Sequence, residues 1–189
     1  MAKLSVIIGS TRPGRVGLPI GQWFLERAIE HGKFDVQLVD LKERNLPLLD
    51  EPKHPRLGEY EQEHTKAWSK VVKESEAFVF VTPEYNFSAP PALLNALDFL
   101  YHEWAYKAAA FVSYGGMSGG IRAVQMLKQP LISMKVVGIP ESVPIAFFAQ
   151  HMESGTFKGS EAHEKAAVVM LDELARWTEA LAGLRGAVR

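Results

Sequence analysis

The chain contains no cysteine among its 189 residues, which excludes disulfide bonds, thiol catalysis and cysteine-ligated metal sites. This absence fits a reducing compartment. An excess of either charge is missing too, because 21 basic and 22 acidic side chains leave a net charge of −1. The sequence therefore gives no electrostatic reason to expect binding to nucleic acid or to an anionic membrane.

Long apolar runs are also missing. The apolar stretch after Lys3 is interrupted at Gly9, which makes it too short for a signal peptide, and no other stretch is long enough to span a bilayer. The sequence shows no internal repeat and no low-complexity segment. Its 47% apolar and 23% charged residues are ordinary for a globular protein. We therefore expect one domain over residues 1–189, located in the cytoplasm.

Apolar stretches typical of strands alternate with stretches of helical periodicity. Residues 77–81 are all apolar and indicate a central strand of a parallel sheet, whereas Ile20, Phe24 and Ala28 recur at helical spacing. Such alternation with short connections favours a parallel sheet with helices on both faces. Strands are expected at 4–9, 34–39, 77–81 and 108–113, with a fifth strand or a broken pair at 136–137 and 143–147. Helices are expected at 17–31, 64–75, 91–101, 120–133 and 160–184, and a long polar loop at 40–61.

Three segments directly follow the first, third and fourth expected strands. They are residues 9–15, 82–87 and 113–120, and each is rich in Gly, Ser, Tyr, Asn or Pro. Ligands of a parallel sheet bind outside the carboxyl ends of its strands. We therefore expect these three segments to converge on one ligand.

The first of these segments is Gly9-Ser10-Thr11-Arg12-Pro13-Gly14-Arg15, placed between a strand and a helix start. Backbone N–H groups at a helix start bind anions, and arginines add charge-assisted contacts. The segment lacks both the Walker pattern and G-x-G-x-x-G, which disfavours triphosphate hydrolysis and the dinucleotide fingerprint. It therefore predicts a site for a singly phosphorylated small molecule. The alternative is a solvated turn with two surface arginines.

The other two segments suit a flat heterocycle. Prolines at 83, 90 and 91 stiffen the loop that carries Tyr85 and Asn86, which can stack on a ring and hydrogen bond to it. The alternative is a proline-rich loop whose Tyr and Phe pack on the core. The segment 113–120 holds four glycines, whose backbone can approach a ligand closely and donate N–H groups to it.

The third segment also matches the G-x-S-x-G nucleophile elbow, with Ser118 as the nucleophile. His151 or His163 would then be the base and Glu141 the acid. The chain is short for that fold, and the arginines of the first segment would have no role. The histidines show no metal-ligand spacing on a common face, so we expect no metal.

Taken together, the motifs Gly9-Ser10-Thr11-Arg12, Pro83-Glu84-Tyr85-Asn86 and Tyr114-Gly115-Gly116 resemble those of the NADPH-dependent FMN reductase family. The stretch from Pro90 to Asp98 resembles that family's next helix, although Leu94 stands where many relatives have a lysine. The resemblance covers the chain from its first strand to about residue 147. It implies an α/β fold, a flavodoxin-like three-layer sandwich with a five-stranded parallel sheet in the order 2-1-3-4-5 and helices on both faces.

The resemblance also implies which residues bind FMN. Ser10 and Arg12 would bind the phosphate, assisted by Thr11 and Arg15, while Gly17, Leu18, Pro19 and Ile20 would close the phosphate pocket. Pro83, Glu84, Tyr85 and Asn86 would line the isoalloxazine, and Ser113, Tyr114, Gly115 and Gly116 would contact its far side or pyrimidine edge.

The activity implied is hydride transfer from NADPH or NADH through FMN to a quinone, azo, flavin or metal-oxyanion acceptor. The cofactor carries out the chemistry, so no catalytic acid, base or nucleophile is assigned to the protein. Relatives are dimers or tetramers, which implies a homodimer or homotetramer, and some place Arg122 and Glu141 in a charge network between subunits. A flavodoxin-type electron carrier is the alternative, although such carriers are strongly acidic and this chain is near neutral.

Overall fold

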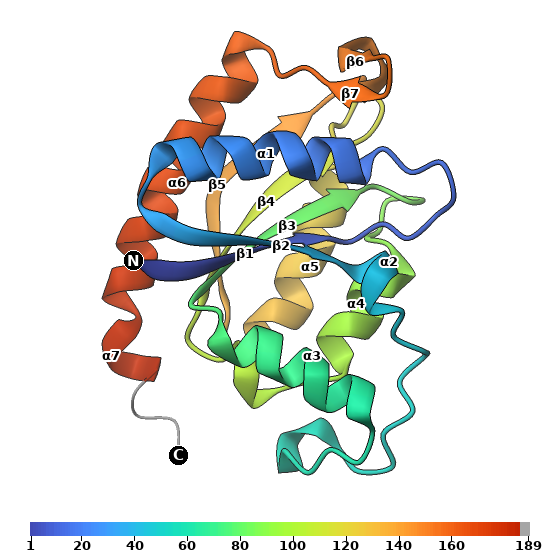
Figure 1. The fold of residues 1–189 in the computed structure, drawn as a ribbon, viewed down its shortest axis with the longest axis vertical. Helices are drawn as coiled ribbons and strands as arrows, with labels where there is room; N and C mark the ends of the chain where they lie inside the picture. The colour runs from blue at the N-terminus through green and yellow to red at the C-terminus, as the bar shows by residue number, and fades with distance from the viewer. Residues whose placement is uncertain (186–189) are drawn as a thin grey trace.

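The computed structural model describes residues 1–185, which fold around a five-stranded parallel sheet (Figure 1). The strand order β2-β1-β3-β4-β5 confirms the expected 2-1-3-4-5 arrangement, and every neighbouring pair is parallel. All residues of the two central strands β3 and β4 are buried, as the apolar runs predict. The strands are β1 (Ala2–Ile8), β2 (Phe34–Asp40), β3 (Ala77–Pro83), β4 (Ala108–Tyr114) and β5 (Val137–Ile145).

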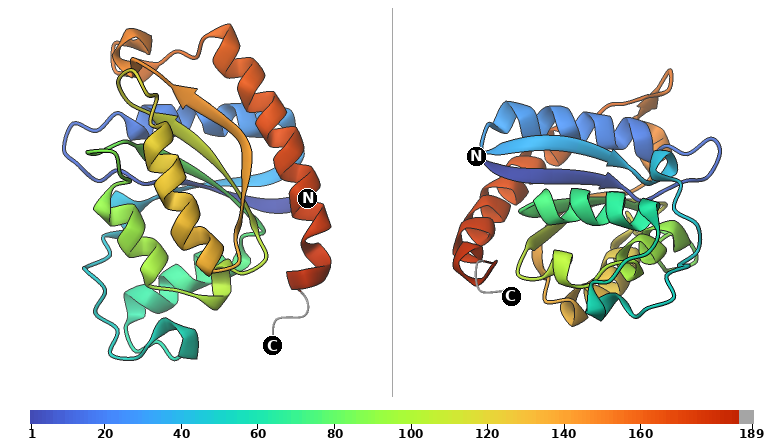
Figure 2. Two further views of the ribbon diagram at one scale, coloured as in Figure 1. Left: turned by 180° about the vertical axis from the view of Figure 1, so that it is seen from behind. Right: turned by 60° about the horizontal axis from the view of Figure 1, so that its bottom comes forward.

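Helices cover both faces of the sheet and bury two separate apolar layers. On one face α1 (Gly17–His31) and α6 (Glu161–Ala180) pack against side chains such as Leu4 and Val6. On the other, α3 (Glu63–Glu74), α4 (Pro91–Asp98) and α5 (Ile121–Ser133) pack against side chains such as Ile7. Figure 2 shows α1 and α3 on opposite sides of β1 and β2. The alternation of Val6 and Ile7 between the two layers follows from the period-two geometry of a strand.

The fifth strand is one continuous edge strand, not a broken pair. Its register against β4 shifts between Ala109 and Phe111, because Ala109 pairs with Gly138 whereas Phe111 pairs with Ser142. Pro140 lies in this unpaired stretch, and proline has no N–H for a ladder hydrogen bond. The bulge therefore accounts for the interrupted apolar pattern in the sequence.

Two expected helices end early. The third ends at Asp98 instead of continuing to residue 101, and the last ends at Ala180 before a separate short helix. The long loop after β2 is partly ordered, because the side chain of Asn95 binds the backbone of Pro47 at 2.7 Å and of Leu49 at 2.9 Å. The sequence did not indicate the small hairpin β6–β7. The short elements are α2 (Leu41–Arg44), β6 (Met152–Glu153), β7 (Thr156–Phe157), α7 (Ala182–Arg185) and 3₁₀ turns at Pro55–Leu57, His102–Trp104 and Phe148–His151.

None of the helices within residues 1–185 is both long enough and apolar enough to cross a membrane.

Candidate functional site: three loops at the carboxyl ends of the strands

The three loops predicted to converge are joined by hydrogen bonds at the carboxyl edge of the sheet. The Gly9 N–H donates to the Val81 carbonyl at 2.9 Å, which joins the loop after β1 to β3. The hydroxyl of Tyr114 donates to Ser10 Oγ at 3.2 Å, and the Glu84 N–H donates to the Tyr114 carbonyl at 3.2 Å. Residues far apart in the sequence therefore meet at one rim, as expected from the topology.

The loop after β1 leads directly into the amino end of α1. No acidic residue stands in the first turn of this helix, and no side chain caps its first N–H groups. A Cβ added to Gly17 would lie 2.3 Å from Ser10 Oγ and 2.6 Å from the Tyr114 hydroxyl, so only glycine allows this close approach. Because the free N–H groups and the helix dipole both favour an anion, this end of α1 is suited to bind one.

The two arginines of this loop have different environments. Arg12 is exposed, and no hydrogen bond or ion pair of its guanidinium is found within residues 1–185. Arg15 forms a two-pronged ion pair with Asp40 at the end of β2, and its Nη1 also donates to the Ser10 carbonyl at 2.6 Å. The side chains of Arg15 and Asp40 are only 9% and 5% exposed, so Arg15 braces the loop from within. Nothing in the sequence signalled this pair, because Arg15 lies in the loop after β1 whereas Asp40 lies at the end of β2.

Asp40 is ionised in this environment. Burial opposes its ionisation, but the hydrogen bonds from Arg15 and from the Lys42 N–H hold the pKa of the Asp40 carboxyl below its ordinary value. The same ion pair raises the pKa of Arg15. Asp40 also caps α2 through Lys42, so one carboxylate connects the first loop, β2 and α2.

The loop after β3 forms a tight turn at its tip. The Tyr85 N–H donates to the Ser88 carbonyl and the Ser88 N–H to the Tyr85 carbonyl, both at 2.9 Å. The two residues between them, Asn86 and Phe87, have φ values of 50° and 68°. Asn86 and Phe87 are exposed at the rim, while Tyr85 is half-buried. The turn therefore presents an amide and an aromatic ring at the rim, and its backbone is closed by hydrogen bonds.

The segment at the end of β4 begins with two buried side chains, Ser113 and Tyr114, and continues through four glycines. Ser113 Oγ donates to the Gly119 carbonyl at 2.7 Å, and burial raises the pKa of the Tyr114 phenol above its usual value. Gly120, at φ 83°, would place a Cβ only 2.8 Å from the Tyr114 nitrogen. At Gly116 no atom of the described residues 1–185 lies within 4 Å of where a Cβ would stand, so this backbone is open to a ligand.

Glu84 joins the second and third loops through a largely buried carboxylate. Its Oε1 accepts from Arg122 Nε at 2.6 Å, and its Oε2 accepts from Ser118 Oγ at 3.0 Å and from the Arg122 N–H at 3.2 Å. Although burial opposes ionisation, these hydrogen bonds lower the pKa of Glu84. Glu84 is predicted to line the isoalloxazine, and the resemblance places Arg122 in a charge network between subunits. Within one chain the two side chains bind each other.

The geometry does not support a serine hydrolase. Ser118 donates to the carboxylate of Glu84, and no histidine within residues 1–185 hydrogen bonds to it. His163 instead accepts the Ser160 N–H in the capping box that begins α6, and its ring packs against His151 at a centroid distance of 4.8 Å. The G-x-S-x-G match therefore lacks the nucleophile–base contact that the mechanism requires. Within the same residues no cluster of three or more His, Asp or Glu could hold a metal ion.

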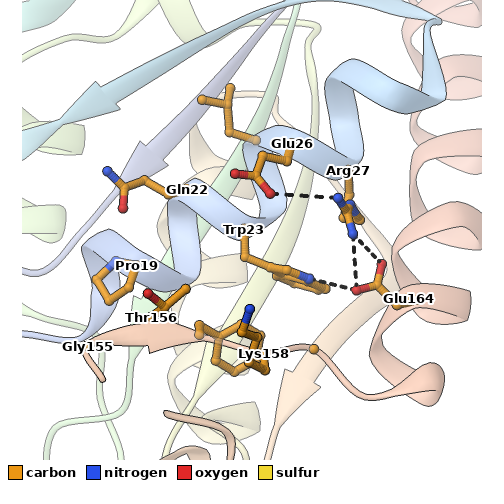
Figure 3. A pocket seen from close by; sticks show the side chains of 12 residues that line it. Pro19, Gln22, Trp23, Glu26, Arg27, Gly155, Thr156, Lys158 and Glu164 are labelled. Carbon is orange, nitrogen blue, oxygen red and sulfur yellow. Dashed lines mark hydrogen bonds and ion pairs between the residues drawn. The ribbon is translucent and has the colours of Figure 1, made fainter. Parts of the chain in front are cut away.

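A separate cavity of about 720 Å³ lies along α1, between this helix, β7 and the start of α6 (Figure 3). Trp23 and Arg27 point from α1 toward Glu164, with Trp23 Nε1 donating to Glu164 Oε1 at 2.8 Å. Of the residues predicted to bind a cofactor, only Pro19 lines this cavity. It is therefore distinct from the place where the three loops meet.

Sequence comparison identifies the family to which the chain is similar. The profile of the family described as NADPH-dependent FMN reductase matches residues 2–150. An NAD(P)H-dependent FMN reductase of Schizosaccharomyces pombe is 46% identical over 126 residues, which are 66% of this chain and 63% of that protein. The match thus covers less than two thirds of the S. pombe protein. The NAD(P)H-dependent FMN reductase LOT6 of Saccharomyces cerevisiae is 36% identical over 158 residues, 76% of this chain and 82% of that protein.

A solved structure shows the same fold. FerB of Paracoccus denitrificans, a flavoenzyme NAD(P)H:(acceptor) oxidoreductase, superposes with a TM-score of 0.75 over 95% of this chain and 98% of that chain, at 24% identity. The family profile covers most of the sequence, and the loops that carry its motifs meet at one edge of a sheet of the expected order. The chain therefore belongs to the NADPH-dependent FMN reductase family, whose enzymes are FMN-dependent NAD(P)H oxidoreductases.

Proposed function

We propose that the three loops bind FMN with its phosphate at the amino end of α1. The N–H groups of the first turn have no intrahelical partner, and no acidic side chain repels an anion there. Ser10, Thr11 and Arg12 precede this turn, and the exposed guanidinium of Arg12 supplies the matching charge. The observation that carries the proposal is the uncapped amino end of α1, with an arginine in the preceding loop for which no ion pair is found within residues 1–185.

The isoalloxazine ring lies between the second and third loops in this proposal. Tyr85 and Asn86 offer stacking and hydrogen bonds, and the open backbone at Gly116 offers its N–H group. The Gly115 N–H already donates to the Ile145 carbonyl at 3.2 Å, so Gly115 contributes by keeping this turn narrow. The side chains of Glu84 and Ser113 bind other protein groups, so these residues contribute through their backbone. Gly17, Leu18, Pro19 and Ile20 form the helix turn at the phosphate, and Pro83 fixes the backbone entering the second loop. Arg15 acts by bracing Ser10 rather than by contacting the phosphate.

Bound FMN supplies the hydride chemistry. The protein orients the ring, restricts water on its covered side and directs N–H groups at negative charge, which is stabilising where solvent is excluded. Tyr114 keeps its proton because it is buried, and its hydroxyl is engaged by Ser10. No protein acid or base is required.

The substrates in this proposal are NADPH or NADH and a small acceptor, which is a quinone, an azo compound, a flavin or a metal oxyanion. Phe87, Met117 and Phe147 are 67%, 82% and 50% exposed and come from the loops at the rim or just after β5. These apolar side chains suit flat acceptors and also a second subunit. We further propose that residues 1–189 form one domain of a cytoplasmic homodimer or homotetramer.

Titration of the purified protein with FMN, followed by NADPH oxidation in the presence of a quinone, tests this function. We expect a yellow complex and steady-state turnover. A flavodoxin-type carrier would bind the flavin but show almost no turnover. A protein that neither binds FMN nor oxidises NADPH or NADH would contradict the proposal.

A further inference from the structure

The turn at the tip of the second loop adopts a backbone conformation that its residues disfavour. Asn86 and Phe87 have φ values of 50° and 68°, within the left-handed region. Asparagine tolerates this region, but a bulky aromatic residue is a clear outlier there. Strain of this kind persists only where the surrounding structure enforces it. The two hydrogen bonds between Tyr85 and Ser88 close the turn, yet they do not relieve the strain at Phe87.

Arg122 contacts both the tip and the base of this turn. Its guanidinium carbon lies 4.0 Å from the centroid of the Phe87 ring, which is close cation–π contact. The same guanidinium binds Glu84 through Nε at 2.6 Å, and the Glu84 side chain is only 7% exposed. Ser118 holds the other oxygen of that carboxylate at 3.0 Å. Arg122 therefore connects the tip of the turn to a buried anchor at its base.

We propose that Arg122 is a positioning residue that clamps residues 85–88 in their strained conformation, and so presents Tyr85 and Asn86 to the flavin ring. The inference rests on the proposed FMN site and extends it to a residue that touches neither the phosphate nor the ring. Because the turn is ordered before the ligand arrives, less entropy is lost on binding. Loss of the clamp then weakens recognition of the ring and leaves recognition of the phosphate intact.

Comparison of FMN with riboflavin, which has the same ring and no phosphate, separates these two effects. Arg122→Ala is expected to weaken the binding of both flavins by the same factor, about tenfold. Arg12→Ala is expected to weaken FMN binding and leave riboflavin binding unchanged. Arg176→Ala serves as the matched control, since Arg176 is 76% exposed on α6 and is paired with Glu173. Arg122→Lys keeps the charge beside Glu84 but loses the planar stack, so it should fall between wild type and Arg122→Ala.

Glycine at position 87 provides the decisive test, since glycine adopts positive φ without strain. In a Phe87→Gly background, Arg122→Ala should cost little flavin affinity, because no strained residue remains to be clamped. Dissociation constants are measured by flavin fluorescence, and thermal unfolding confirms that each variant is folded. Unchanged binding by Arg122→Ala, or an equal loss with and without Phe87, would overturn the inference. If wild type itself binds neither flavin, the proposed function fails as well.

Discussion

At the scale of the residue, Gly17 is the most constrained position of the site. A methyl group there would collide with Ser10 Oγ and the Tyr114 hydroxyl, both of which are buried. Gly17→Ala should therefore push α1 away from the first loop, with a loss of about 1–3 kcal/mol in the free energy of unfolding and weaker FMN binding. Urea unfolding and an FMN titration measure the two effects. Gly183→Ala is the control, because no atom of residues 1–185 lies within 4 Å of its added Cβ.

Arg12 differs from Gly17 because its expected effect is on the ligand alone. Its side chain is exposed and forms no hydrogen bond or ion pair within residues 1–185 that the substitution would break. Arg12→Ala should raise the dissociation constant of FMN about ten- to a hundredfold, the range for one hydrogen bond to a charged group. The melting temperature without flavin should not change. An unaltered dissociation constant would contradict the phosphate assignment.

At the scale of the element, the ion pair of Arg15 and Asp40 holds three segments together. Removal of one partner leaves the other charge buried and unpaired, which costs about 3–5 kcal/mol in typical cases. Asp40→Ala should approach this loss, because it also removes the cap of α2 at Lys42. Urea unfolding measures it, with Asp35→Ala on the same strand as an exposed control. A loss no larger than that of the control would show that the pair does not brace the loop.

The pH dependence of this pair has a definite sign. The pKa of Asp40 is lower in the folded chain than in the unfolded one. Its contribution to stability is therefore complete above the pKa of the unfolded chain, about 3.9. This contribution is lost as the pH falls through the lower pKa of the folded chain. The Asp40→Ala variant lacks this contribution at every pH. The difference in the free energy of unfolding between wild type and Asp40→Ala should therefore shrink as the solution becomes acidic.

At the scale of the whole molecule, a buried lysine far from the site links global stability to pH. Burial lowers the pKa of Lys107 to about 7, and its Nζ donates to the Val72 carbonyl at 2.6 Å at the end of α3. In the unfolded chain the pKa of a lysine is about 10.4. Between the two pKa values the unfolded chain therefore binds more protons than the folded chain, and the free energy of unfolding rises with pH. Groups around Lys107 that modulate this include Arg185, Glu103 and Glu76.

Wild type should therefore gain about 2 kcal/mol in the free energy of unfolding from about pH 7 to about pH 9 through Lys107. Lys107→Met removes the titrating amine and keeps the apolar stem, so this increment should be absent from it. Urea unfolding of both proteins at the two pH values gives the difference. Parallel curves would show that Lys107 stays charged in the folded protein.

The sequence predicted the helices and strands in which the buried residues form a continuous run or recur at a regular spacing. The apolar run at 77–81 and the spacing of Ile20, Phe24 and Ala28 predicted β3 and α1, because each depends on local pattern alone. The edge strand β5 was ambiguous, since a bulge at Pro140 breaks its period. The hairpin β6–β7 was missed because four residues carry too little pattern.

The sequence by itself determined which three loops follow the strands at the carboxyl edge of the sheet, and it determined the family. Both depend on local motifs and on their order along the chain. Only the tertiary structure decided which charges are free. Arg12 and Arg15 are equivalent in the sequence, yet Asp40 pairs with one of them. Likewise Glu84 meets Arg122 only after folding. Ion pairs form between residues close in space and carry no signature in sequence spacing. Only the folded structure therefore separates Arg15, which pairs with Asp40, from Arg12, for which no ion pair is found within residues 1–185.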